Sequence, residues 1–231
     1  MKPKISQNLS SNTLFHFTRS LGILMGILQS GFKLTFVPEL LPKKAPNGES
    51  LYYVVPMVCF CDIPLGGIKV HLEEYGNYGL GVHKKICQVK NINPVFYIHN
   101  CRTFDAIFPN TIEDSTSVIP YVKEYSGNSV KKDKVVRFYN EREWRHVDTG
   151  KMQILQGDRD RALKVCKGLN QEYDKYLRFE LDNFEYIIVK NTVDVYHIIE
   201  MIYAYMKEIP EERKRFLCSK IISAIRIKGD F

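Results

Sequence analysis

Residues 14–32, LFHFTRSLGILMGILQSGF, predict a β-strand followed directly by an α-helix. The first residues alternate, so His16 and Thr18 lie on one face of the predicted strand and two phenylalanines on the other. Apolar residues then recur at the spacing of an amphipathic helix, Thr18 or Ser20 can cap its start, and Gly31 is typical of a helix end. A polar pair on an early strand is either a feature of the protein interior or part of a site.

The composition of the 231-residue chain, 45% hydrophobic and 26% charged, is that of a globular protein with a sizeable core. Its net charge of +7 is compatible with a polyanionic partner, but acidic residues are mixed among the basic ones, which favours a solvated surface over a nucleic-acid groove. Six cysteines without a CxxC pair favour a reduced, cytoplasmic protein. No secretion signal, membrane span or metal site is predicted.

The remaining segments predict an α+β protein. Strands and helices alternate irregularly, and some strands follow each other as hairpins, so we expect mixed, mostly antiparallel sheets with flanking helices in a single domain over residues 1–231. A polar connection at about 109–132 has the weakest secondary-structure signal in the sequence. The other predicted elements are strands over 54–61, 93–99, 176–181, 186–189 and 220–227, helices over 71–74, 86–89, 157–168 and 193–209, and a loop over 40–50.

Residues 139–145, YNEREWR, carry the strongest candidate chemistry. If this segment is extended, Glu141, Glu143 and Arg145 project from one face. One interpretation is a solvent-exposed ladder of paired charges, which contributes little to stability. The other is an acid centre in which Arg145 keeps a carboxylate ionised beside a developing positive charge. The segment alone favours the ladder.

A second segment, residues 75–84 with the sequence YGNYGLGVHK, is rich in tyrosine and glycine. Its glycines Gly76, Gly79 and Gly81 indicate that the backbone closely approaches another group. It contains G-x-G without the third glycine of a dinucleotide fingerprint, and no P-loop occurs in the chain.

The order of three features resembles the three-motif layout of the ADP-ribosyltransferases: the polar pair on an early strand, the tyrosine-glycine segment, and a late E-x-E. The phrases HFT, IL..GF and VPMVCFC are also similar to the start of the DarT-type DNA-modifying toxins. Nearly the whole chain resembles the AbiGi family of bacterial abortive-infection, or phage-resistance, proteins. The phrases that carry this resemblance are LFHFT, GILQSGF, VPMVCFCDIPL, YGNYGLGVHK, NPVFY, EREWR and IRIKGDF.

The transferase resemblance implies an ADP-ribosyltransferase-like fold with NAD as a substrate. His16 would donate to a ribose hydroxyl, and Thr18 would hold the carboxamide of nicotinamide. Either Tyr75 or Tyr78 would stack on the nicotinamide ring. Glu143 would stabilise the ribosyl cation as the glycosidic bond breaks, as carboxylates do in glycosidases.

The same resemblance assigns the remaining candidate residues. Glu141 would orient or deprotonate the acceptor, which would be nucleic acid or protein, and Arg145 would belong to the NAD-binding set. Phe60 and Asp62 would line the wall of the pocket. Each candidate also has a purely structural alternative: a buried histidine at His16, a helix cap at Thr18, core aromatics at the tyrosines and a turn former at Asp62.

The family resemblance leaves two functions open. The chain is either an NAD-dependent mono-ADP-ribosyltransferase-like toxin or effector in phage defence, or a non-catalytic antitoxin or regulatory partner on a transferase-like scaffold. The second alternative follows from the AbiGi label itself, which describes antitoxins of an operon whose partner resembles a nucleotidyltransferase toxin. An RNA-binding fold is a weaker alternative, because the RNA-recognition signatures are absent from the sequence.

Overall fold

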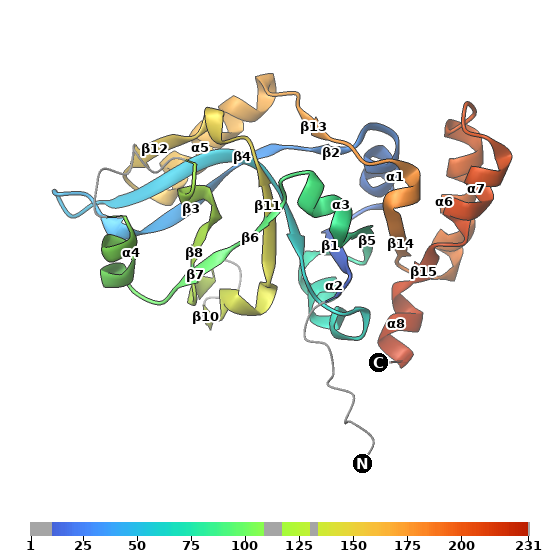
Figure 1. The fold of residues 1–231 in the computed structure, drawn as a ribbon, viewed down its shortest axis with the longest axis horizontal. Helices are drawn as coiled ribbons and strands as arrows, with labels where there is room; N and C mark the ends of the chain where they lie inside the picture. The colour runs from blue at the N-terminus through green and yellow to red at the C-terminus, as the bar shows by residue number, and fades with distance from the viewer. Residues whose placement is uncertain (1–10, 109–116, 130–133, 231) are drawn as a thin grey trace, which may run out of the picture. The chain divides into compact units, whose positions relative to one another are not determined.

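The computed structural model describes residues 11–108, 117–129 and 134–230. It combines helices with mixed, mostly antiparallel sheets, which confirms the predicted α+β class (Figure 1). The chain divides into two compact units, each assembled from separate segments. Unit 1 comprises Met1–Gly31, Phe60–Lys90 and Arg178–Phe231, and unit 2 comprises Phe32–Cys59 and Asn91–Leu177. A single domain over residues 1–231 stays a prediction.

Unit 1 is built around a mixed sheet. Its strands are β1 (Thr13–Thr18), β5 (Tyr78–His83), β14 (Phe184–Val189) and β15 (Ile221–Ser223). They lie in the order β15-β14-β5-β1; β14 and β15 are parallel, and the other neighbours are antiparallel. His16 lies opposite Leu80, and Thr18 lies opposite Tyr78. The predicted early strand is therefore confirmed, and the tyrosine-glycine segment supplies its neighbour in the sheet.

Unit 1 contains α-helices and short 3₁₀ helices. They are η1 (Leu65–Gly67), α2 (Lys69–Tyr75), α3 (Lys84–Val89), η6 (Leu181–Asn183), α6 (Thr192–Tyr205), α7 (Glu211–Cys218), α8 (Ala224–Asp230) and, first in the chain, α1 (Leu21–Ser30). The Ser20 hydroxyl accepts a hydrogen bond from the Ile23 N–H at 3.2 Å, and Gly31 ends α1 with a φ of 96°. The predicted helix after β1 is thus confirmed at both ends.

The predicted final strand over 220–227 is wrong beyond Ser223. The chain turns there into α8, with Ala224 and Ile227 both buried in one cluster with Phe15. Two apolar residues three apart share one face of a helix, whereas on a strand they would point to opposite faces. Burial of both side chains in one cluster therefore favours a helix over a strand in this short apolar segment.

The glycines of the tyrosine-glycine segment lie in tight contacts, as the sequence predicts. Gly76 has a φ of 129°, and a Cβ atom there would lie 2.2 Å from the carbonyl oxygen of Thr18. A Cβ on Gly79 or Gly81 would lie less than 3 Å from the side chains of Phe17 and Thr13, respectively. Because these glycines lack a Cβ atom, their backbone can lie this close to β1.

Unit 2 is organised around the long buried strand β4. Its strands are β2 (Phe32–Lys33), β3 (Thr35–Lys44), β4 (Ser50–Cys61, whose last two residues belong to unit 1), β6 (Asn93–Pro94), β7 (Phe96–Ile98), β8 (Val122–Glu124), β9 (Gly127–Ser129), β10 (Lys134–Val136), β11 (Glu143–Val147), β12 (Gln153–Gln156) and β13 (Tyr176–Leu177). β4 pairs antiparallel with β3 and β12 and lies beside β11. β6 pairs antiparallel with β11, β13 pairs antiparallel with β2, and β7 pairs parallel with β8.

The predicted loop over 40–50 is shorter in the structure, because β3 continues to Lys44 and the turn is centred near Gly48. Leu41 is 2% exposed and belongs to the core, so its burial favours extension of the strand across a sequence rich in proline and lysine. The turn residue Gly48 has a φ of 86°, which a glycine adopts without strain.

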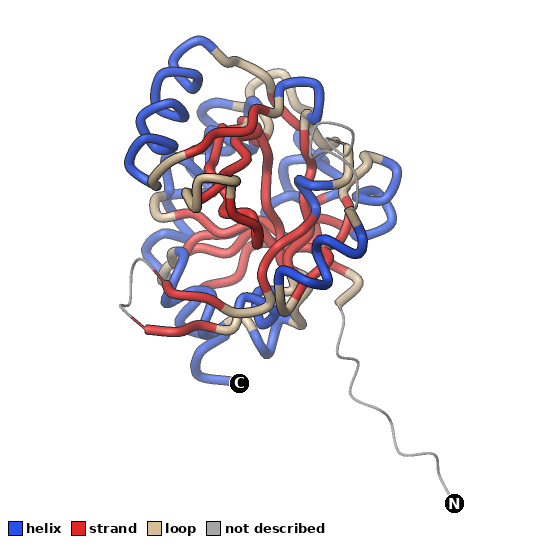
Figure 2. Tube along the Cα trace, turned by 90° about the vertical axis from the view of Figure 1, so that its left-hand side faces the viewer, coloured by secondary structure: helices blue, strands red, loops and turns tan. Residues whose placement is uncertain are grey.

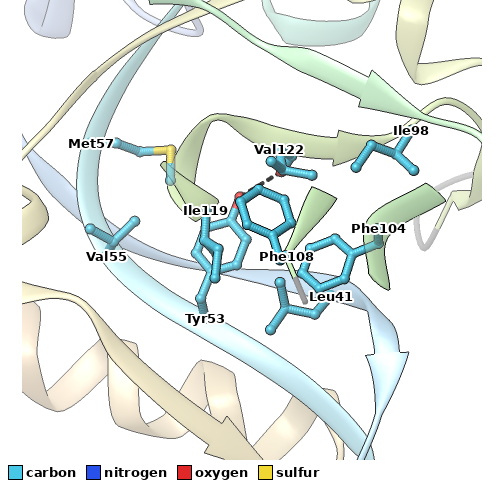
Figure 3. Close-up of a cluster of buried hydrophobic side chains, with 9 residues drawn as sticks. All are labelled: Leu41, Tyr53, Val55, Met57, Ile98, Phe104, Phe108, Ile119 and Val122. Atoms are coloured by element: carbon cyan, nitrogen blue, oxygen red, sulfur yellow. Dashed lines mark hydrogen bonds between the residues drawn. The ribbon is translucent and has the colours of Figure 1, made fainter. Parts of the chain in front are cut away.

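A hydrophobic cluster on one face of β4 forms the core of unit 2 (Figure 3). Tyr53, Val55 and Met57 alternate along β4 and point to the same side. Phe104 from α4 (Cys101–Ile107) and Val122 from β8 pack against them. The other helices of unit 2 are η3 (Ile119–Tyr121), η4 (Phe138–Glu141), η5 (Thr149–Lys151) and α5 (Arg159–Glu172).

The predicted polar connection at 109–132 is in part ordered. η3, β8 and β9 lie within 119–129. Over the described chain as a whole, helices and strands are joined by loops (Figure 2). Residues 109–116 and 130–132 of this prediction lie outside the described residues.

Candidate functional site

The E-x-E segment is not continuously extended. Its first acid ends the η4 turn at Glu141, where Arg142 adopts a left-handed conformation with a φ of 43°. The Arg142 N–H donates to the carbonyl of Tyr139 at 3.2 Å and closes this turn. β11 begins only at Glu143. The prediction that one extended strand carries both glutamates is therefore wrong.

Glu143 and Arg145 do lie on one face of β11 and form a two-pronged ion pair. Arg145 Nε donates to Glu143 Oε1 at 2.8 Å, and Nη2 donates to Oε2 at 3.1 Å. The pair is buried, because Arg145 is 0% and Glu143 7% exposed. The interpretation as a solvent-exposed charge ladder is therefore wrong.

The rest of the Arg145 guanidinium is also bound. Nη1 donates to the Tyr53 hydroxyl at 2.6 Å and to the Pro120 carbonyl at 2.7 Å, and Nη2 lies 3.3 Å from a carboxylate oxygen of Glu39. An arginine has five N–H donors, and each of them has a partner here. β3, β4, η3 and β11 thus converge on one buried cation.

A second cation, Lys123 from β8, joins the two glutamates. Its Nζ donates to Glu143 Oε2 at 2.9 Å and to Glu141 Oε2 at 2.7 Å. The ammonium also lies 5.1 Å from the centre of the Phe138 ring. On the backbone side, the Glu143 N–H donates to the Tyr97 hydroxyl at 2.9 Å. Both oxygens of Glu143 therefore accept from a cation, and its backbone is held as well.

These charges determine the ionisation of the cluster. Burial alone would raise the pKa of Glu143, but the positive charges of Arg145 and Lys123 outweigh it and lower that pKa below its usual range. Burial would lower the pKa of Lys123, but Glu143 and the other carboxylates raise it well above its usual value. Glu143 is thus ionised at neutral pH, and its charge is compensated by two cations.

The predicted residues of the first strand lie in unit 1. His16 is half-buried, and its ring lies 5.9 Å from the ring of Phe60 in an edge-to-face arrangement. Thr18 is buried opposite Tyr78. The structure therefore brings His16 next to Phe60, and Thr18 next to Tyr78, in the first unit of the chain.

The carboxylate of Asp62 is used inside the protein. It lies 2.5 Å from Lys84 Nζ and accepts a hydrogen bond from the Ser11 N–H at 2.9 Å. This buried pair ties the residues before β1 to the end of β4 and the start of α3. The alternative of a turn former at Asp62 stays a prediction.

The two candidate tyrosines differ in their contacts. The Tyr78 hydroxyl donates to Asp194 at 2.9 Å, and burial together with this carboxylate raises the pKa of Tyr78 to about 12. The Tyr75 ring packs 5.8 Å from the ring of His71. Of the predicted residues, unit 1 holds His16, Thr18, Phe60, Asp62, Tyr75 and Tyr78, and unit 2 holds Glu141, Glu143 and Arg145.

Sequence reasoning missed several members of the Glu143 cluster. Lys123 lies in the polar connection and carries no motif. Tyr53, in contrast, left a signal: on the buried strand it shares a face with Cys59, and the hydroxyl of a buried tyrosine needs a polar partner. The other missed members are Glu39 and Tyr97.

Within the described ranges, no group of three or more histidine, cysteine, aspartate or glutamate side chains is placed to hold a metal ion. Of the helices in the same ranges, none has both the length and the apolar character needed to cross a bilayer.

In sequence, the chain is similar to proteins described as acting in phage resistance. Residues 51–124, which include most of β4 and the Lys123 position, match the family model described as "Putative abortive phage resistance protein AbiGi, antitoxin". The chain is 25% identical over 249 residues to the "Abortive phage resistance protein AbiGi" of Lactococcus lactis subsp. cremoris, an alignment covering 86% of this chain and 100% of that protein. No solved structure matches the chain.

Proposed function

We propose that this chain is an abortive-infection protein of the AbiGi family that acts in the cytoplasm as a non-catalytic antitoxin, restraining a toxin protein by binding it. The observation that carries the proposal is the compensation of Glu143 by Arg145 and Lys123. The antitoxin description of the matched family model and the 25% identical phage-resistance protein support the same role.

The two cations bound to Glu143 limit what its carboxylate can do in catalysis. Breaking the glycosidic bond of NAD builds positive charge on the ribose, which an uncompensated carboxylate stabilises. The carboxylate of Glu143 already faces a guanidinium and an ammonium. Moving it to a ribose would break both of its hydrogen bonds with the buried Arg145 and leave that guanidinium only Glu39 as a charged partner, at a cost of about 3–5 kcal/mol, typical for breaking a buried ion pair. The cluster is therefore better suited to hold unit 2 together than to catalyse.

Co-expression tests this role. The chain is expressed alone, and together with the toxin encoded beside it, and colony formation is counted. Expressed alone the chain should be harmless, and it should restore growth to cells that make the toxin. Killing by this chain alone, relieved by Glu143→Gln, would exclude the antitoxin role.

The second candidate function is NAD-dependent mono-ADP-ribosyl transfer to nucleic acid or protein on an ADP-ribosyltransferase-like fold. Two observations favour it: His16 lies against Phe60 in unit 1, and Glu141, with a side chain 25% exposed, is bound through one oxygen by Lys123. In this function His16 binds the ribose of NAD, and Glu141 orients the acceptor. Thr18, Phe60, Asp62, Tyr75, Tyr78, Glu143 and Arg145 complete the proposed set.

Calorimetric titration with NAD tests the second candidate. It predicts saturable binding that His16→Ala weakens about tenfold, the loss of roughly one hydrogen bond to a bound ligand. His99→Ala, at an exposed histidine of unit 2, should leave the affinity unchanged. Absence of NAD binding by the folded wild-type protein would rule this candidate out and leave the antitoxin role untouched.

A further inference from the structure

A hollow of about 420 Å³ lies in unit 1 beside the turn that joins α2 to β5. Its wall comes from distant parts of the chain: Arg19 after β1, residues 72–74 and 76–78, and Lys190 just before α6. Volumes of this order are typical of sites for small ligands. The position of the hollow is set by the β1–β5 pairing, so it is part of the folded unit rather than of a long loop.

One side of the hollow is fixed by Gly76. A Cβ atom at this position would lie 2.2 Å from the Thr18 carbonyl oxygen and 2.9 Å from the Cα of Arg19. Only a residue without a side chain allows the turn to lie so close to the backbone that carries Arg19. The contact therefore determines where the Arg19 side chain begins.

The neighbouring residues of the turn are held by side-chain hydrogen bonds. Asn77 Oδ1 accepts from Lys228 Nζ at 2.9 Å, and the Tyr78 hydroxyl donates to Asp194 at 2.9 Å. Both bonds join the turn to the C-terminal segments of unit 1. A wall fixed before a ligand arrives costs less conformational entropy on binding.

The two cations of the hollow are available to a ligand. In the described part of the chain, neither the Arg19 nor the Lys190 side chain has an ion pair or hydrogen bond, and both residues are exposed. A guanidinium and an ammonium that face one hollow are the donors that bind phosphate groups in proteins.

Two carboxylates, Glu73 and Glu74, line the same hollow. They disfavour a ligand that is only anionic, but a carboxylate accepts hydrogen bonds from hydroxyl groups. A ligand that satisfies both the cations and Glu73 carries a phosphate at one end and hydroxyls at the other. We propose that this hollow binds a sugar phosphate, with the phosphate on Arg19 and Lys190 and the sugar hydroxyls on Glu73.

The proposal is tested by titrating the full chain with ribose 5-phosphate, inorganic phosphate and ribose, followed by calorimetry. Ribose 5-phosphate should bind about tenfold or more tightly than either of the other compounds, since it satisfies both kinds of side chain. Arg19→Gln and Lys190→Gln should each weaken ribose 5-phosphate binding by about tenfold. Glu73→Gln should reduce the preference for ribose 5-phosphate over inorganic phosphate.

Lys69→Gln is the matched control, because Lys69 is an exposed lysine of α2 outside the hollow and its loss changes the net charge equally. Its affinities should equal those of the wild type. Absence of binding by all three compounds, equal affinity for ribose 5-phosphate and inorganic phosphate, or unchanged affinity in Arg19→Gln and Lys190→Gln would each overturn the proposal. The experiment contains neither NAD nor a toxin, so its failure is separate from a failure of the proposed functions.

Discussion

Arg145 binds the carboxylate of Glu143 through two parallel hydrogen bonds of 2.8 and 3.1 Å, and both residues are buried in unit 2. The two residues are two apart on β11, so their side chains leave the strand on the same face. The pair contributes mainly through the cost of breaking it, since Arg145 alone would keep only Glu39, and Glu143 alone only Lys123, as a charged partner.

Removing the cation should therefore destabilise the protein strongly. We expect Arg145→Met to lower the free energy of unfolding by about 3–5 kcal/mol, because Glu143 and Glu39 lose their buried partner. Urea unfolding followed by circular dichroism measures it. Arg159→Met, at an exposed arginine of α5, should change the stability by no more than about 0.5 kcal/mol, and equal effects of the two changes would contradict the account.

Removing both charges should restore part of the loss. In the Glu143→Leu/Arg145→Met protein neither member of the pair is left buried alone, and Lys123 keeps Glu141 as a partner. We expect the double variant to be at least about 1 kcal/mol more stable than the sum of the two single changes predicts. Strict additivity in the same urea experiment would show that the two side chains are not coupled.

The lowered pKa of Glu143 gives a specific pH dependence. A carboxyl whose pKa is lower in the folded state stabilises the protein above its unfolded pKa, 4.5, and loses this contribution as the pH falls. Wild-type stability should therefore decline below about pH 4.5, and Glu143→Gln should show a shallower decline. Unfolding free energies measured from pH 7 to pH 3 test this, and parallel curves would speak against it.

His71 should act in a higher pH range. Neither of its ring nitrogens has a hydrogen-bond partner within the described residues, and burial lowers the pKa of His71, an effect that the nearby Glu74 opposes. Its contribution to stability is present above pH 6.5 and is lost as the pH falls. His71→Leu should flatten the stability curve between about pH 7 and pH 5, whereas replacing the exposed His99 should not.

Two glycines should respond in opposite ways to alanine. Gly76→Ala forces a Cβ atom to within 2.2 Å of the Thr18 carbonyl at a φ of 129°, so we expect a loss of about 1–3 kcal/mol. Gly22 lies in α1 with no atom within 4 Å of an added Cβ, so Gly22→Ala should add about 0.5–1 kcal/mol. Thermal unfolding compares them, and a neutral Gly76→Ala would refute the close contact.

Much of unit 1 could be predicted from local pattern. Alternation gave β1, and the spacing of apolar residues together with Ser20 and Gly31 gave both ends of α1. The predicted final strand is wrong beyond Ser223. There Ala224 and Ile227 pack in one cluster with Phe15, which is distant in sequence, and this packing favours a helix. A short apolar run does not by itself distinguish a strand from a helix.

The candidate site likewise combines residues that the local sequence pattern could predict with residues that only the tertiary structure brings together. The sequence could pair Glu143 with Arg145, which are two apart on one strand. It could not supply Lys123, and it indicated for Tyr53 only that a buried hydroxyl needs a polar partner, not which one. Lys123 lies twenty positions before Glu143, and Tyr53 is ninety-two positions from Arg145, so tertiary folding alone brings them together. The left-handed conformation of Arg142 also has no sequence signal, since a non-glycine residue rarely adopts it.

The central claim is that Glu143 holds the structure of unit 2 and is not a catalytic acid. Release of labelled nicotinamide from NAD by the purified chain, with nucleic acid and protein present as acceptors, tests it most directly. The account predicts the same background rate for the wild type and for Glu143→Gln. Release by the wild type that a folded Glu143→Gln protein loses would contradict it.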